Sequence, residues 1–129
     1  MKRCLLAAGA LAASLAAGGA AEPRVKVPDA KTLMIAAIDA ADGRAHGVLT
    51  GEVADAVTQT FQATFPVYID VSTEKRYGQQ GCARLKVTFW QDGVRLPSGT
   101  AGCLLPLRRQ TIEFGVNKCR DGQPPRSLR

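Results

Sequence analysis

Two stretches of alternating residues, GCARLKVTFWQDG (81–93) and RRQTIEFGVNKCRDG (108–122), decide the fold of this chain. The first stretch opens at Cys82 and ends on a turn signal, whereas the second alternates first and ends at Cys119. Apolar and polar residues that alternate with period two are typical of a half-buried β-strand. Each stretch is therefore predicted to form one strand.

The two strands match each other as antiparallel neighbours when Cys82 lies opposite Cys119. In that register inward residues meet inward residues and outward residues meet outward ones: Leu85 with Val116, Val87 with Phe114, Phe89 with Ile112, Thr88 with Glu113 and Arg84 with Asn117. A shift by one residue would turn the charged face inward, so the agreement favours this register. We predict a Cys82–Cys119 disulfide, which would stabilise the fold by about 3–4 kcal/mol in the chain-entropy model.

The first 21 residues have the pattern of a secretory signal peptide. Lys2 and Arg3 precede an apolar run rich in Leu and Ala, and small residues lead to Glu22. The apolar run is short for a membrane span and no later run is longer, so no transmembrane segment is expected after cleavage. The remaining chain is large enough for one domain. We predict a periplasmic or secreted protein, in a compartment that permits disulfides.

Composition and residue spacing argue against several classes of function: nucleic-acid binding, metal binding and catalysis. Without Lys2 and Arg3 the chain keeps 15 basic against 11 acidic residues, spread along its length. There is no basic run interleaved with aromatics, so no nucleic-acid partner is expected. His46 is the single histidine, and no cysteine–histidine cluster has metal-ligand spacing. No nucleophile–base pair is visible, so we predict a non-enzymatic protein without metal or cofactor.

The N-terminal half is less regular. Residues 22–30 hold two prolines and are predicted to form an extended arm. The apolar run KTLMIAAIDA (31–40) fits a buried strand or a short helix, and the ADG turn signal at 41–43 favours a strand that returns over 44–50. Residues 51–63 change to a helical period, with Thr50 as a candidate N-cap.

The strand pattern then resumes. Residues 67–74 alternate cleanly, with Val67, Ile69 and Val71 inward. The predicted fold is α+β: one helix packed on an antiparallel sheet of about five strands, with a disulfide across the last hairpin. We expect a single α+β domain over 31–121, followed by a flexible basic tail at 122–129.

A candidate binding surface lies on the outer face of the sheet and in its loops. Its members are residues that point outward on the predicted strands, and two pairs of basic residues in loops at strand ends. The outward residues are Tyr68, Asp70, Arg84, Lys86 and Trp90, and the basic pairs are Lys75 with Arg76 and Arg108 with Arg109. Aromatic and arginine side chains supply most anchors in protein interfaces. Two other interpretations remain open. The charges could form a solvated, charge-paired face, and Trp90 could lie under the loop that follows it.

Cys103 is left unpaired by the predicted disulfide. It could be a buried, unreactive thiol, or it could join two chains in a dimer. It lies in the long connection 91–109, and long loops in small domains are often functional. The alternative function is therefore a small exported inhibitor or immunity protein that acts on an envelope enzyme through this loop.

Two segments, YGQQGCARLKVTFWQDGV and IEFGVNKCRDGQPP, resemble small exported proteins encoded with proteobacterial conjugation and type IV secretion machinery. The resemblance covers the C-terminal half of the mature chain and transfers no functional residues. It implies an accessory role in the envelope. The leading expectation is therefore a periplasmic binding or assembly module with an envelope protein as its partner.

Overall fold

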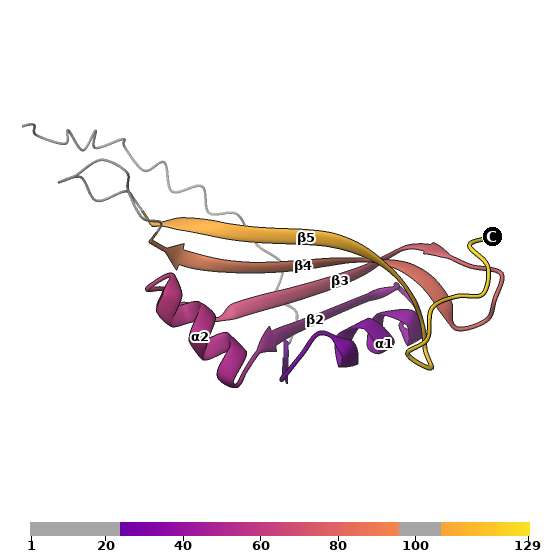
Figure 1. Cartoon of the computed structure of the whole chain (residues 1–129), viewed down its shortest axis with the longest axis horizontal. Helices are drawn as coiled ribbons and strands as arrows, with labels where there is room; N and C mark the ends of the chain where they lie inside the picture. Colours follow the sequence, from indigo (N-terminus) through magenta and orange to yellow (C-terminus); the bar gives the residue numbers. More distant parts are fainter. Residues whose placement is uncertain (1–23, 96–106) are drawn as a thin grey trace, which may run out of the picture.

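The structure, a computed structural model, describes residues 24–95 and 107–129. Five strands form one sheet in the order β1-β2-β3-β4-β5 (Figure 1). β1 pairs with β2 in parallel and the other neighbours are antiparallel. The elements are β1 (Val25–Val27), α1 (Lys31–Asp39), β2 (Arg44–Leu49), α2 (Glu52–Thr60), β3 (Val67–Arg76), β4 (Cys82–Val94) and β5 (Arg108–Cys119). The α+β class is confirmed, with two helices among the described residues instead of the one expected.

The predicted strand at 31–40 is wrong, because this segment forms α1. Its buried residues are Leu33, Met34, Ala37 and Ile38, which recur at helical spacing. The side chain of Asp29 accepts a hydrogen bond from the Lys31 N–H at 2.9 Å and so supports the first turn. The ADG segment does form a turn, in which the Gly43 N–H donates to Ala40 O at 3.1 Å. This turn connects helix α1 to strand β2 instead of joining two strands.

The expected N-terminal arm is partly built into the sheet. β1 pairs with the last three residues of β2, and α1 connects the two strands. Thr50 does not cap α2; its backbone N–H and its Oγ1 both donate to Val27 O, at 2.8 and 3.3 Å. Gly51, with a φ of 98°, precedes the helix instead. Val27, which precedes α1, and Thr50, which precedes α2, are therefore hydrogen-bonded to each other and attach β1 to the sheet.

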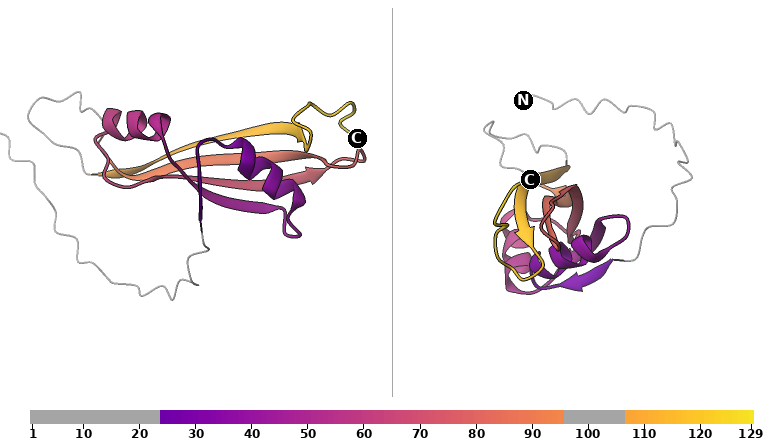
Figure 2. Two further views of the ribbon diagram at one scale, coloured as in Figure 1. Left: turned by 90° about the horizontal axis from the view of Figure 1, so that it is seen from below. Right: turned by 90° about the vertical axis from the view of Figure 1, so that its right-hand side faces the viewer.

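The hydrophobic core lies on one face of the sheet, between the strands and the two helices. Both helices contribute to it, and they lie near opposite ends of the sheet (Figure 2). α1 packs closely on β2, because a Cβ added at Gly47 would lie 2.6 Å from Leu33 Cδ1. The buried strand residues include Ile69, Val71, Leu85 and Val87, each with at most 1% exposure. The inward parity predicted for β3 and β4 is thus confirmed.

The register of the last hairpin is the predicted one from Cys82 to Gln91, and it shifts between Gln91 and Val94. Cys82 pairs with Cys119, Leu85 with Val116, Val87 with Phe114 and Phe89 with Ile112. Cys82 and Cys119 form a disulfide, and both side chains are 3% exposed. The predicted disulfide is confirmed.

The inward face of β5 is not covered along its whole length. Ile112 and Phe114 have the predicted parity, yet they are 59% and 42% exposed. In Figure 1 β5 forms one edge of the sheet, and neither helix extends along it. The expectation that these side chains are buried is wrong, because parity selects a face and only a packed helix buries it.

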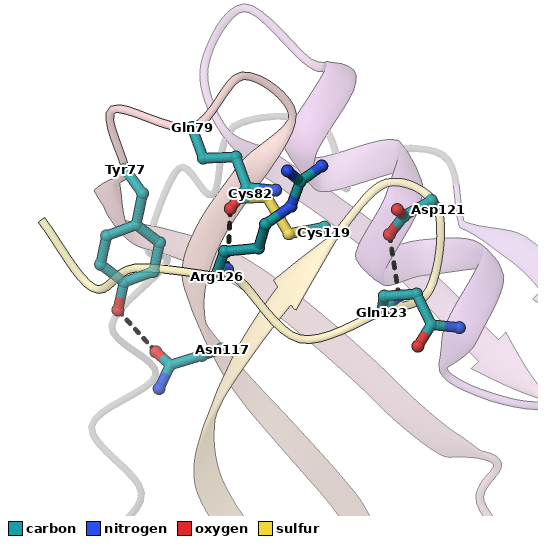
Figure 3. The surroundings of a disulfide bond; sticks show 8 residues. All are labelled: Tyr77, Gln79, Cys82, Asn117, Cys119, Asp121, Gln123 and Arg126. Atoms are coloured by element: carbon teal, nitrogen blue, oxygen red, sulfur yellow. Dashed lines mark hydrogen bonds between the residues drawn. A yellow bond between two sulfur atoms is a disulfide. The ribbon is translucent and has the colours of Figure 1, made fainter.

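The C-terminal residues fold back onto the disulfide end (Figure 3). The Gly78 N–H donates to Arg129 O at 2.8 Å, and the Arg126 N–H donates to the Gln79 side chain at 2.8 Å. Tyr77 also donates to Asn117 Oδ1 at 2.6 Å. The contacts of Arg126 and Arg129 place the tail against the loop between β3 and β4.

Candidate functional site

Two aromatic rings lie side by side on the outer face of the sheet, between two guanidinium groups. Tyr68 on β3 lies opposite Trp90 on β4, with ring centroids 4.3 Å apart. Arg24 lies over the Tyr68 ring at 4.7 Å, and Arg109 lies over the Trp90 ring at 4.2 Å. We call these four residues the cation–aromatic ladder. A cation over an aromatic face is attracted by the ring quadrupole, so each arginine favours the position of the ring beneath it.

Asp70 holds one side of the ladder in place. Its Oδ2 accepts a hydrogen bond from Trp90 Nε1 at 2.7 Å. Its Oδ1 lies 2.7 Å from His46 Nδ1 and 2.9 Å from Arg24 Nη1. Burial raises the pKa of Asp70, but the hydrogen bonds from His46, Trp90 and Arg24, together with the Arg24 charge, outweigh it and leave the pKa below its ordinary value.

Asp92 holds the other side. Arg109 donates to it through Nε at 2.6 Å and through Nη2 at 3.1 Å, which is a bidentate contact. The hydrogen bond from Arg109 lowers the pKa of Asp92, a small desolvation opposes this, and the Arg109 charge adds to the lowering. The guanidinium is thereby fixed over the Trp90 ring.

The ladder is suited to recognition. Tyr68 and Trp90 are half-buried, so part of each residue is accessible, while Asp70 and the two arginines restrict rotation of the rings. Side chains that are fixed before binding lose little conformational entropy when a partner arrives. This outer face therefore offers two rigid aromatic anchors between two cations.

The structure brings only part of the predicted surface together. Tyr68, Asp70, Trp90 and Arg109 meet in the ladder. Arg84 pairs with Glu74 at 3.5 Å and Lys86 with Glu113 at 3.4 Å, further along the same face. These two pairs match the charge-paired interpretation of the outer face.

The basic pairs that were expected in loops lie instead at strand ends, at the end of β3 and the start of β5, and their members have separate contacts. Arg76 donates to Ile38 O at 2.9 Å and to Ala40 O at 3.0 Å, so it caps the C-terminal end of α1. Lys75 lies over the Tyr77 ring at 5.6 Å, and Arg108 is exposed at the start of β5. The expected loop 91–109 is shorter than predicted, because β4 continues to Val94 and β5 begins at Arg108. Cys103 lies outside the described residues.

Sequence reasoning missed three members of the site: Arg24, His46 and Asp92. His46 was noted only as the single histidine, and pairing of β2 with β3 brings it opposite Asp70. Asp92 belonged to a turn signal that lies within β4. Arg24 reaches the site because β1 pairs with β2. No local sequence pattern predicts this long-range pairing.

Asp70 makes the stability of this face dependent on pH. A carboxyl group whose folded pKa is lowered contributes stability that is complete above its unfolded pKa and is lost as pH falls through the folded pKa. We expect Asp70→Asn to lower the free energy of unfolding at pH 7 by about 1–2 kcal/mol. The difference from wild type should shrink below pH ~4. Urea unfolding of both proteins from pH 7 to pH 2 measures this, and a difference that stays constant over that range would contradict the assignment.

The other parts of the described surface are weaker candidates for a binding site. An open hollow of about 850 Å³ lies at the disulfide end, but its charged groups are engaged: Arg120 contacts Asp39 at 3.3 Å and Asp121 accepts the Gln123 N–H. Within the described ranges no three His, Cys, Asp or Glu side chains gather to hold a metal ion. No helix in those ranges has the length and apolar character to cross a membrane.

Comparison of the chain with protein-family models, with curated proteins and with solved structures found no match.

Proposed function

We propose that this protein is a non-enzymatic, exported binding or assembly module that docks an envelope protein on the cation–aromatic ladder. The observation that carries the proposal is the ladder itself, with Tyr68 and Trp90 stacked at 4.3 Å and flanked by Arg24 and Arg109. Tryptophan, tyrosine and arginine are the residues most enriched among binding hot spots. The buried Cys82–Cys119 disulfide supports residence in an oxidising compartment.

A protein surface fits the ladder better than a small ion does. Each arginine of the ladder already contacts a carboxylate, Arg24 with Asp70 and Arg109 with Asp92. The ladder therefore presents aromatic rings and charge-paired guanidinium groups rather than uncompensated charge. With the resemblance noted above, we propose a conjugation or type IV secretion apparatus as the setting.

The test is site-specific photocrosslinking in the native envelope. A photoreactive residue at Thr88 lies on the outer face, opposite Asp70; the matched position Val53 lies on α2 and is 63% exposed. We expect a discrete crosslinked protein from Thr88 and none from Val53. Trp90→Ala should weaken binding of the captured protein by about thirtyfold, as loss of a hot spot does.

A crosslink that survives Trp90→Ala unchanged would reject the ladder as the docking surface. A crosslink that disappears only when residues 96–106 are deleted would support the inhibitor function instead. Val53→Ser serves as the control for general effects of surface substitution, since this side chain lies outside the ladder.

A further inference from the structure

β5 leaves a long edge of the sheet open. Within the described part of the chain this 12-residue strand pairs with β4 alone. The Arg120 N–H donates to Gly81 O, next to β4, whereas the Cys119 N–H turns away and donates to Gln123 O. Hydrogen-bonding directions alternate along an antiparallel strand. The backbone groups that face the open edge therefore belong to Thr111, Glu113, Gly115 and Asn117.

Apolar side chains accompany this edge. Ile112 and Phe114 are 59% and 42% exposed, and the Phe114 ring stacks on Phe89 at 6.1 Å. A long unpaired edge beside exposed apolar side chains is a template for pairing with another strand. The remaining question is which strand fits.

We propose that a second copy of this chain pairs with β5 edge to edge, about a two-fold axis at Phe114. A two-fold axis perpendicular to the sheet keeps equivalent faces on the same side. Residues that lie opposite each other across the axis must then point to the same face of the sheet. With the axis at Phe114, even-numbered residues of β5 oppose even-numbered ones and odd-numbered residues oppose odd-numbered ones, so this condition is met. Phe114 meets its own copy, Ile112 meets Val116, and Gln110 meets Lys118. The inward apolar positions of both strands are matched.

The neighbouring symmetric registers fit less well. An axis at Glu113 would place two like carboxylates directly opposite one another, which destabilises a strand pair. An axis at Gly115 would place Ile112 against Lys118. A shift in register changes every cross-strand pair at once, so the match at Phe114 selects one arrangement.

Charge complementarity on the outer face supports the same register. With the axis at Phe114, Glu113 of one chain lies opposite Gly115 of the other. Gly115 has no side chain, and the Arg84 guanidinium covers it: a Cβ added there would lie 2.6 Å from Arg84 Nη2. On both sides of the axis the Glu113 carboxylate would therefore approach Arg84 of the second chain. This contact would add to the pairs that Glu113 makes with Lys86 and Arg84 makes with Glu74 within each chain. An unrelated strand would not supply this reciprocal pair.

Sedimentation and light scattering of the mature protein, in a Cys103→Ser background, test the dimer. We expect a reversible dimer, formed in the absence of the Cys103 thiol. Phe114→Glu should weaken it about a hundredfold, because it removes the apolar contact at the axis and opposes two carboxylates. Val53→Glu, on exposed α2, should leave the dimer unchanged. Trp90→Ala should also leave it unchanged, which separates this inference from the proposed function.

Cysteine crosslinking tests the register. Phe114→Cys should form a disulfide-linked dimer under mild oxidation, because the axis places this position opposite itself in a pair without backbone hydrogen bonds. Ile112→Cys and Val116→Cys should not link alone, since each lies opposite the other. A mixture of these two variants should link.

Several results would overturn the proposal. One is a protein that remains monomeric up to ~100 µM. Another is a dimer that persists in Phe114→Glu or that crosslinks best at Ile112→Cys. A dimer that disappears on Cys103→Ser would indicate an intermolecular disulfide. Crosslinking of Phe114→Cys only to a different protein would identify a foreign strand as the occupant.

Discussion

Removal of the Cys82–Cys119 disulfide is expected to lower the free energy of unfolding by about 4 kcal/mol. The bond closes a loop with a sequence separation of 37, and its loss restores that conformational freedom to the unfolded chain. Small domains have a total stability of roughly 5–15 kcal/mol. The Cys82→Ala/Cys119→Ala variant should therefore unfold at a much lower urea concentration than wild type.

Two comparisons make this measurement specific. Reducing agent should bring wild type down to the stability of the double variant, and it should leave the double variant unchanged. Cys103→Ser should retain wild-type stability, because the disulfide joins Cys82 and Cys119. Equal unfolding midpoints for wild type and the double variant would show that the bond does not constrain the unfolded chain.

The last hairpin could be predicted from sequence because three independent signals agree there. Alternation assigned the faces, the cysteines fixed the register, and the outward pair of Arg84 and Asn117 was consistent with both. Tyr68 and Trp90 followed from parity alone, and the register of β3 with β4 places them opposite each other. Period-two patterns report such local geometry directly.

Other features depend on contacts that no local pattern records. The segment 31–40 is apolar on nearly all sides, so its period was ambiguous, and packing of Leu33 on Gly47 stabilises the helix. Arg24 joins the ladder through a parallel strand pair formed across α1. Arg76 looked like a loop cation, and its role as a cap of α1 could not be seen before that helix was known.

Among the residues that point inward from the sheet, we expect the contribution to the free energy of unfolding to depend on how deeply each side chain is buried. Leu85 on β4 is completely buried and belongs to the core cluster. Leu85→Ala is expected to lower the free energy of unfolding by about 3 kcal/mol, since it leaves a cavity that the packed neighbours fill only in part. Chemical unfolding at low protein concentration, where the chain is monomeric, measures this.

Ile112→Ala is the informative control, because Ile112 has the same inward parity but is 59% exposed. Removing an exposed apolar side chain takes little surface out of the core, so we expect a change below about 1 kcal/mol. If Ile112→Ala destabilised the monomer as much as Leu85→Ala, the inward face of β5 would have to be covered within the chain itself. The edge would then hold no exposed apolar strip for a second copy, so this pair of variants tests the dimer and the core together.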